Sequence, residues 1–286
     1  LSFDGVDDYV EVPYSSGFNN FTDAISVMVW VKVTGNQGSQ QTIIENGDVK
    51  GFALAITNDL RIYPHLKTTA GWFALPIGSS MEMDTWQHVA FTYNGSALIG
   101  FLNGQEIGSL SVSGTIENNN ENLNFGFYKN WQNYLNGNID ETSIWNTALD
   151  SSQIASYMST PPTGNEEGLA GYWNFNSGEG ETLYDHSGNQ NHGTINGATW
   201  STDVPFQGGL TQVSDSSYTF NVAAAADGII TPTISTNAVL DRAANGNTAA
   251  SEYSVVYNGV APSAPGELSA SAGSQQATLT WANNSE

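Results

Sequence analysis

Alternation between apolar and polar positions along the chain predicts short β-strands. The clearest case spans residues 24–33, where one face carries five aliphatic side chains: Ile25, Val27, Val29, Val31 and Val33. Met28 and Trp30 fall on the other face, because successive side chains of a strand point in opposite directions. Both faces are apolar, so the pattern predicts an interior strand that is covered on both sides.

Turn signals divide residues 86–107 into three strands. Asn94-Gly95 and Asn103-Gly104 are pairs typical of the tight turns that join antiparallel strands. The 30 glycines of the chain separate short runs rich in valine, isoleucine and aromatic residues. Short strands separated by glycine-containing turns predict an all-β sandwich.

One helix is predicted at about residues 151–158. Asp150 can cap its first turn, and Gln153 stands three residues later as the return partner of a capping box. The helix should end before Pro161 and Pro162, because the residue before a proline avoids helical geometry.

A change in composition after about residue 200 indicates a domain boundary. Residues 209–258 contain no tryptophan and are rich in alanine, threonine, serine and asparagine. The sequence therefore predicts a first domain over residues 1–205 and a second, plainer β module over 206–260. A proline-spaced linker opens the remaining segment, 261–286, whose alternating end predicts the first strands of a third module.

The charge balance excludes one class of partner. The chain has 28 acidic and 6 basic residues, a net charge of -22, so we expect no nucleic-acid partner, because phosphates would be repelled. It has no cysteine, which removes disulfides and thiolate zinc sites and leaves calcium as the natural metal. No apolar run approaches the roughly 18 to 20 residues that cross a bilayer, so no membrane insertion is expected. Because the chain does not begin with methionine, we expect a piece of a longer protein.

Three segments carry a family resemblance. They are LSFDGVDDYVEV at residues 1–12, WQHVAFTY at 86–93 and GNIDETSIWNTAL at 137–149. In this order they resemble the opening, middle and closing signatures of concanavalin A-like jelly rolls, closest to the laminin-G-like and pentraxin-like branch. The resemblance implies a jelly-roll sandwich over residues 1–205, in a family whose functions range from glycan lectins to adhesion modules and spacers.

Residues 168–200 resemble a segment that precedes the opening signature in many relatives, although here it follows the closing one. We interpret this segment as an edge of the jelly roll, supplied from the C-terminal side as in a circular permutation. The alternative is the start of a second, truncated copy. The first interpretation is favoured because no second opening signature follows Trp200.

The C-terminal segments carry further resemblances. Residues 206–260, with SYTF at 217–220, are similar to the second half of bacterial immunoglobulin-like repeats. Residues 261–286, with ATLTW at 277–281, resemble the start of a fibronectin type III domain. Strings of such modules belong to large secreted or surface-attached bacterial proteins. The resemblance therefore implies a secreted or cell-surface location, with neighbouring modules of the same long chain as partners.

An enzyme is the sharpest alternative, because some glycoside hydrolases share this sandwich. Their retaining chemistry needs two carboxylates about 5 Å apart. The corresponding stretch here has Asn138 and Ser143 where the resemblance would require the paired acids. The four histidines also lack the context of a hydrolytic triad. We therefore predict no catalytic residues.

Clusters of oxygen-bearing side chains are candidate calcium sites, since this cation takes roughly six to eight oxygen ligands. The first cluster joins Asp4, Asp7 and Asp8 to Asp140, because the opening and closing strands lie near each other in relatives. Crowded acids without a base nearby favour a cation. The alternative makes Asp7-Asp8 a solvated turn and Asp140 the cap of a bulge.

The second calcium candidate is an alternating array of side-chain oxygens at Asp185, Ser187, Asn189 and Asn191. It lacks the closing glutamate of an EF-hand loop. The same residues could form an ordinary turn through bonds from side chain to backbone. Ligand loop and turn both remain open at this point.

The third calcium candidate rests on the pentraxin resemblance, which puts Glu45, Asn46 and Asp48 in a metal-binding role. The facing loop, residues 128–136, has no acid, so the two-calcium site of pentraxins is expected to be missing. Aromatic and amide side chains replace the acids, and sugars stack on aromatic rings while amides bond their hydroxyls. The predicted glycan surface consists of Tyr128, Asn130, Trp131, Gln132 and Tyr134, with Trp72 as a further wall.

These observations predict a secreted or cell-surface, noncatalytic binding module that calcium stabilises and that binds carbohydrate. The alternative is a protein-adhesion module or spacer without a glycan site. A glycoside-active enzyme is a remote third. The first two differ in whether Trp131, Tyr128 and Trp72 converge on one solvent-facing surface or point into the core.

Overall fold

The computed structural model describes the backbone of six strands beyond residue 210 and, with side chains, residues 1–15, 20–47, 50–74, 78, 80–129 and 131–205. The chain divides into two compact units, Leu1–Phe206 and Gln207–Glu286. Each unit is described by itself. Within the described residues, no helix has the length and apolar character that crossing a membrane would require.

Seven antiparallel strands form the first sheet, in the order β1-β14-β3-β8-β9-β10, with β15 also paired to β14. Their bounds are β1 Ser2–Asp4, β3 Ile25–Val33, β8 Gln87–Tyr93, β9 Ala97–Leu102, β10 Gln105–Ser111, β14 Asn136–Trp145 and β15 Leu169–Trp173. The predicted meander of three strands is confirmed as β8, β9 and β10. The predicted interior strand is confirmed as β3.

Eight strands form the second sheet, in the order β16-β17-β2-β11-β4-β5-β6-β7. Their bounds are β2 Tyr9–Val12, β4 Gln41–Asn46, β5 Phe52–Ile56, β6 Ile62–Thr68, β7 Gly71–Ala74, β11 Leu123–Phe125, β16 Thr182–Leu183 and β17 Gly193–Asn196. A separate hairpin of β12 Phe127–Tyr128 and β13 Asn133–Tyr134 follows β11. This arrangement confirms an all-β, concanavalin A-like jelly roll.

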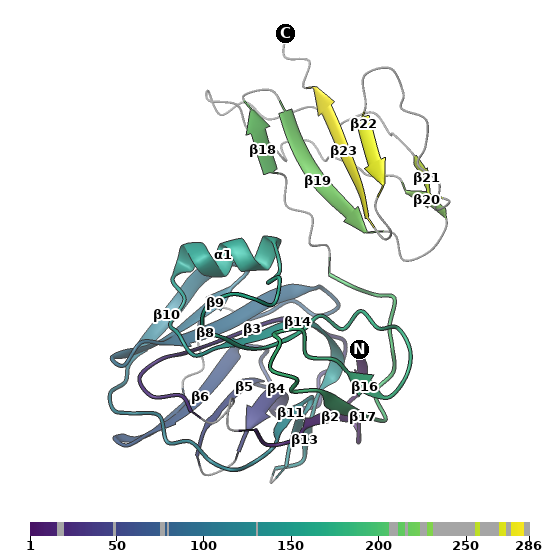
Figure 1. Cartoon of the computed structure of the whole chain (residues 1–286). Helices are drawn as coiled ribbons and strands as arrows, with labels where there is room; N and C mark the ends of the chain where they lie inside the picture. The colour runs from purple at the N-terminus through teal and green to yellow at the C-terminus, as the bar shows by residue number, and fades with distance from the viewer. Residues whose placement is uncertain are drawn as a thin grey trace. The chain divides into compact units, whose positions relative to one another are not determined.

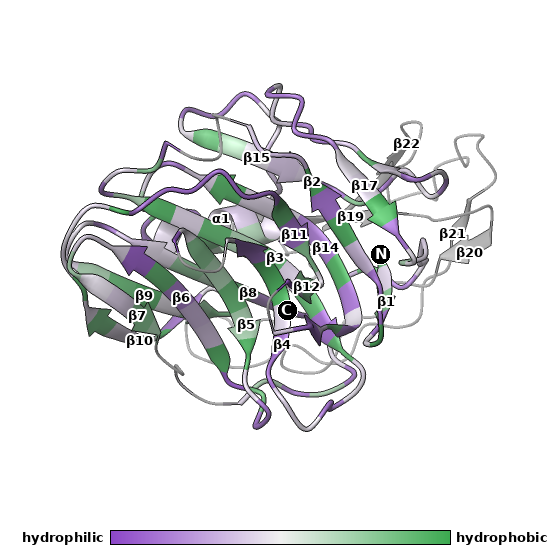
Figure 2. Ribbon diagram, turned by 90° about the horizontal axis from the view of Figure 1, so that it is seen from below, coloured by the Kyte–Doolittle hydropathy of each residue, from purple (hydrophilic) through white to green (hydrophobic). Residues whose placement is uncertain are grey.

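The core lies between the two sheets. The aliphatic face of β3 is buried there with alternate residues of the second sheet, such as Val10, Leu54 and Leu66. Figure 2 shows hydrophilic and hydrophobic residues alternating along strands of both sheets. Since alternate side chains of a strand point to opposite faces, each sheet also has an outer face, and the two outer faces differ in what they carry.

Helix α1, Ser151–Ser159, covers part of the outer face of the first sheet (Figure 1). Its predicted capping box is confirmed: the Asp150 side chain accepts a 2.9 Å bond from the Gln153 N–H, and the Gln153 side chain accepts a 3.0 Å bond from the Asp150 N–H. The buried face of the helix packs through Ile154 into a second apolar cluster that includes Met28 and Trp145. Where the helix packs, the outer face of the first sheet is therefore apolar as well.

Residues 168–200 lie at edges of both sheets. Strand β15 pairs with β14, while β17 pairs with β2 and carries β16 outside it. A bridge also links Ser2 to Thr199, which exchange backbone hydrogen bonds of 2.8 and 3.0 Å. Strands from the two ends of the first unit therefore complete the same sandwich.

The second unit contains a four-stranded sheet of β18 Thr211–Ser214, β19 Ser217–Ala223, β23 Gln276–Ala282 and β22 Ser269–Ala272, and a pair formed by β20 Gly228–Ile230 and β21 Val255–Tyr257. The β19–β23 pairing joins segments on both sides of the predicted boundary at 260/261. The immunoglobulin-like and fibronectin type III-like assignments stay predictions.

Candidate functional site

A row of polar side chains crosses the outer face of the second sheet. The register aligns Glu11 of β2 with Asn124 of β11, and Asn124 in turn with Glu45 of β4. Glu45 then aligns with Ala53, and Ala53 with His65 of β6. The neighbours of these residues along each strand point into the core, so Glu11, Asn124, Glu45 and His65 share the outer face. We call these four residues the polar row.

The middle of the polar row is held by a hydrogen bond between strands. The Asn124 amide donates to Glu45 Oε1 over 2.8 Å, and both side chains are buried. Glu11 at one end is exposed, and His65 at the other end is half-buried. The row therefore combines a fixed amide–carboxylate pair with a carboxylate that solvent can reach.

Within the described part of the chain, two buried neutral polar atoms on this face have no hydrogen-bond partner. They are Thr42 Oγ1 and His65 Nε2. Thr42 aligns with Ala55, which alternates with core residues Leu54 and Ile56, so Thr42 also faces outward. Burial lowers the pKa of His65 to about 4, which leaves its imidazole neutral at pH 7. An unmet hydrogen bond costs free energy, and a bound ligand could supply the partner.

The hairpin β12–β13 contributes two rings beside the polar row, and strand β2 contributes a third. Phe127 aligns with Tyr134, and their rings stack with centroids 4.7 Å apart. Phe127 also contacts Tyr9 of β2 at 5.3 Å. All three rings are half-buried, so part of each remains accessible. We call Tyr9, Phe127 and Tyr134 the aromatic stack.

Trp131 stands at the tip of this hairpin and is 71% exposed. The neighbouring Gln132 is exposed too, with a left-handed backbone (φ 49°) that turns the chain into β13. The expectation of an exposed Tyr128 is wrong, because only 5% of this residue is accessible. Paired positions alternate across a hairpin, so Tyr128 lies on the side opposite to Phe127. Asn130 lies outside the described residues.

Trp72 is 43% exposed but does not join Trp131. It lies on the edge strand β7, three strands away from β4, next to which the hairpin packs. Three strand spacings amount to about 14 Å. Its partner Lys67 lies toward the end of the sheet opposite to the hairpin. The predicted convergence of Trp72 with the loop aromatics is therefore wrong.

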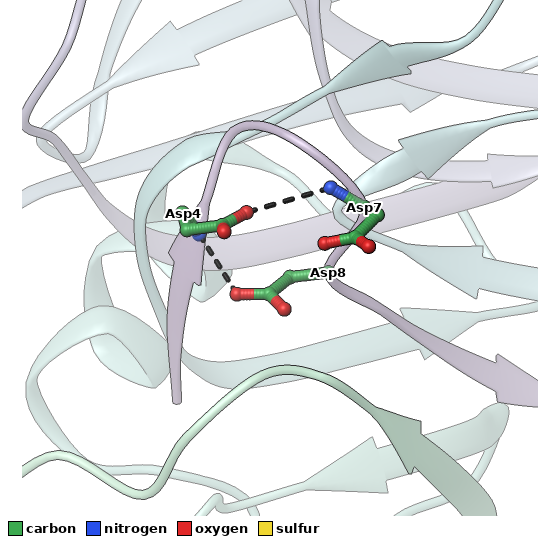
Figure 3. A group of neighbouring side chains, drawn as sticks. All are labelled: Asp4, Asp7 and Asp8. Atoms are coloured by element: carbon green, nitrogen blue, oxygen red, sulfur yellow. Dashed lines mark hydrogen bonds between the residues drawn. The ribbon is translucent and has the colours of Figure 1, made fainter.

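Three carboxylates gather on the turn between β1 and β2 (Figure 3). Oxygens of Asp4, Asp7 and Asp8 all lie within 4.8 Å of one another, the one such group of acids and histidines in the described part of the chain. The Asp4 N–H donates to Asp8 Oδ2 over 2.9 Å, and the Val6 N–H donates to Asp4 Oδ1 over 2.8 Å. Burial, and then the charges of Asp4 and Asp7, raise the pKa of Asp8. We call these three residues the acid turn.

The acid turn has the span of a calcium site. Calcium–oxygen distances of about 2.5 Å allow two ligands of one ion to stand up to about 5 Å apart, which suits the 4.8 Å grouping. The turn also adjoins the aromatic stack: after burial, the charge of Asp7 is the next cause that raises the pKa of Tyr134. The acids and the rings therefore lie at the same end of the sandwich.

Asp140 does not belong to the acid turn, and the predicted four-acid cluster is wrong. Asp4 aligns with Asn136, four positions from Asp140, or about 13 Å along β14. Asp140 aligns instead with Trp30, on the outer face of the first sheet, where it is buried. Its Oδ1 accepts a 2.9 Å bond from the Glu141 N–H beside a β-bulge, as the alternative interpretation expected.

Asp185 organises a turn rather than an open ligand loop. Its two carboxylate oxygens accept backbone N–H bonds from Tyr172, Ser187 and Asn191 at 3.0, 2.8 and 2.9 Å. The Asn189 amide donates to the carbonyls of Leu169 and Ala170, and that of Asn191 donates to Ala170. Backbone groups thus occupy the Asp185 oxygens expected to bind metal, and the two amides are turned toward β15.

The remaining calcium candidate is only partly described. Asp48 lies outside the described residues. Glu45 bonds to Asn124, and Asn46 donates to the Glu121 carbonyl over 3.4 Å. Glu45 thus enters the site as a member of the polar row.

Several residues of this site were missed by sequence reasoning. Alternation along β2 could have marked Tyr9 and Glu11 as outward-facing. No local pattern shows that β11 enters between β2 and β4, which brings Asn124 beside Glu45 across 79 positions of sequence. Phe127 could not be separated from Tyr128 without the register of the hairpin.

Comparisons with known proteins agree with this fold. A family model described as the concanavalin A-like lectin/glucanases superfamily matches residues 4–155. No curated protein matches the chain. A candidate carbohydrate binding protein from Bacteroides ovatus is similar in structure, with a TM-score of 0.57 and 20% identity over 68% of this chain. The match spans 58% of the Bacteroides protein.

Two further solved structures are similar over 55% of this chain. A CBM40 of a Ruminococcus gnavus sialidase, bound to α2,3-sialyllactose, has a TM-score of 0.45 and 14% identity and is covered over 96% of its length. A heptameric pentraxin from Limulus polyphemus has a TM-score of 0.41 and 15% identity and is covered over 79%. At these identities, the likeness concerns the fold.

Proposed function

Because the chain belongs to the concanavalin A-like lectin/glucanases superfamily, we propose that its first unit is a noncatalytic carbohydrate-binding module. The observation that carries this proposal is Trp131, a 71% exposed indole at the tip of a hairpin whose base is the aromatic stack. Exposed rings offer flat apolar surface to the C–H faces of sugars. Gln132 and Glu11, the exposed member of the polar row, supply groups that can bond to hydroxyls.

Binding rather than hydrolysis suits the arrangement of carboxylates. Glu11 and Glu45 share a face, but β11 separates their strands, so two strand spacings place them about 10 Å apart. Retaining hydrolases need about 5 Å, and inverting ones need about 6.5 to 9.5 Å with room for water between the acids. Here Asn124 fills that position and bonds to Glu45.

Calcium is proposed as a stabilising ion at the acid turn. Asp4, Asp7 and Asp8 supply carboxylate oxygens at a suitable span, and like charges brought this close favour a cation between them. An ion there would hold the turn beside Tyr134 and so support the aromatic stack.

The setting we propose is a secreted or cell-surface, multi-domain bacterial protein, in which neighbouring modules accompany this one.

The test is a glycan array probed with the full chain and with two matched variants. Trp131→Ala should weaken binding at least tenfold while changing the free energy of unfolding by less than about 1 kcal/mol, as surface substitutions usually do. Trp72→Ala removes the same side chain from a distant edge and should leave affinity within about twofold. Binding that survives Trp131→Ala would contradict the site. An array with no bound glycan would favour a protein-adhesion module or spacer.

A further inference from the structure

Carboxylates are concentrated where the proposed glycan would lie. Glu11 is exposed at one end of the polar row, and Glu45 is part of its floor. The charge of Asp7, in the neighbouring acid turn, contributes to raising the pKa of Tyr134. A ligand that touches both Glu11 and the aromatic stack therefore meets negative charge from β2 and from the turn between β1 and β2.

Each lysine that the described residues contribute to this face has a glutamate beside it. Lys67 points outward from β6 and pairs with Glu117, with Nζ 3.9 Å from Oε2. Lys129, on the hairpin, pairs with Glu121 at the same distance. Burial lowers the pKa of His65 to about 4, so it carries no charge at neutral pH.

The other basic side chains of the described residues lie elsewhere. Lys32 pairs with Asp203 on the outer face of the first sheet, and Arg61 pairs with Asp59 before β6. Lys50 lies on the turn that follows β4, whereas the hairpin adjoins the start of that strand at Ile43. Ile43 and the last residue of β4, Asn46, are about 10 Å apart along the strand, and Lys50 lies beyond Asn46. None of these three can serve a ligand bound at the aromatic stack.

We propose that this site discriminates by charge: it binds neutral or amino-bearing glycans and rejects glycans that carry carboxylates. This inference rests on the proposed carbohydrate-binding function. A sialic or uronic acid carboxylate would be placed beside like charges, while both lysines that the described residues contribute to this face already pair with glutamates. Repulsion between like charges at close range gives strong specificity. A protonated amino sugar would meet the same carboxylates with attraction.

The experiment uses the full chain on an array of matched sugars at low salt. Each neutral glycan is printed with its charged counterparts: lactose with 3′-sialyllactose, and β-1,4-linked glucose oligomers with the corresponding glucosamine and glucuronate oligomers. We expect the acidic member of each bound series to be at least tenfold weaker than the neutral member, and the amino member to be equal or stronger. The differences should narrow as salt screens the charges.

Two variants test whether the discrimination against acidic glycans comes from the outer face of the second sheet. Glu11→Gln should reduce the neutral-to-acidic ratio about threefold or more, because it removes the exposed carboxylate and keeps the side chain's shape. Glu106→Gln makes the same change on β10 of the other sheet and should leave the ratio unaltered. The series is run in calcium and in chelator, because an ion at the acid turn would offset part of the negative charge.

The possible results distinguish a failure of the charge discrimination from a failure of carbohydrate binding. Acidic glycans that bind as well as neutral ones would overturn the charge discrimination and leave carbohydrate binding intact. An unchanged ratio in Glu11→Gln would overturn its assignment to the polar row. An array without any bound glycan would overturn both the function and the inference.

Discussion

Asp140 is a carboxylate that the fold has removed from water. It lies beside Trp30 on the outer face of the first sheet, and a bond from the Glu141 N–H is its one backbone hydrogen bond among the described contacts. Burial raises the pKa of Asp140 to about 6, against about 3.9 for an aspartate in an unfolded chain. This difference in pKa makes the free energy of unfolding depend on pH, because the folded chain holds the Asp140 proton more tightly than the unfolded chain does.

The contribution of Asp140 to the free energy of unfolding should fall as the pH rises from about 4 to about 6, and it should not change further above that range. Asp140→Asn keeps an acceptor for the Glu141 N–H without the charge, so it should be more stable than the native chain above pH 6. The gain approaches about 3 kcal/mol, at about 1.4 kcal/mol for each unit of pKa.

Urea unfolding at pH 4 and pH 7 measures this difference, with Asp84→Asn, on an exposed turn, as the control. If Asp140→Asn were less stable at pH 7 in calcium and unaffected in chelator, Asp140 would be a metal ligand after all, as the sequence first suggested.

At the level of secondary-structure elements, hydrogen bonds of the turn at residues 185–193 connect strands of both sheets. The Asp185 carboxylate holds the Tyr172 N–H of β15 and closes the turn that leads into β17. The indole of Trp173 donates to the Asn191 carbonyl over 3.0 Å, and the Ser15 hydroxyl donates to Asn191 Oδ1 over 2.7 Å. One buried carboxylate therefore links β15, in the first sheet, to the edge of the second sheet.

Asp185→Ala should destabilise the first unit by about 3 kcal/mol or more. Three backbone N–H groups would lose a charged acceptor, and Asp185 itself is buried. Because the role we assign is structural, the loss in chemical unfolding should be equal in calcium and in chelator. Asp185→Asn, which keeps one acceptor oxygen, should lose less. A destabilisation seen in calcium alone would restore the ligand-loop interpretation.

At the scale of the whole molecule, the charge of -22 makes any bound cation a source of stability. An ion that binds the folded state and not the unfolded one stabilises by mass action, about 2.7 kcal/mol at a hundredfold excess over its Kd. For a unit of about 200 residues, this corresponds to a rise of about 5 to 10 °C in Tm.

We therefore expect chelation to lower the Tm of the full chain and added calcium to restore it. Asp7→Asn removes one carboxylate of the acid turn and should abolish most of this response. Asp84→Asn removes the same charge from an exposed position with a left-handed backbone that asparagine tolerates, and should keep the response. Differential scanning calorimetry measures all three chains, and an equal response in both variants would place the ion elsewhere.

The sequence by itself determined what depends on near neighbours. Strand β3, the meander and the capped helix follow from period-two alternation, turn pairs and one capping box, all of which act over a few residues. The exposure of Trp131 follows in the same way, from a stretch in which aromatic and amide residues break the alternation. These features needed no knowledge of which strands pair.

Only the tertiary structure decided which distant residues meet. Hydrogen-bonded register put β11 between β2 and β4 and so built the polar row, and it separated Asp140 from the acid turn by four positions along β14. Side chains of one strand alternate every residue, so a register known to within a few positions fixes neither the face nor the partner of a side chain. Local periodicity is the same for every pairing of the strands, and the site therefore came from the pairing.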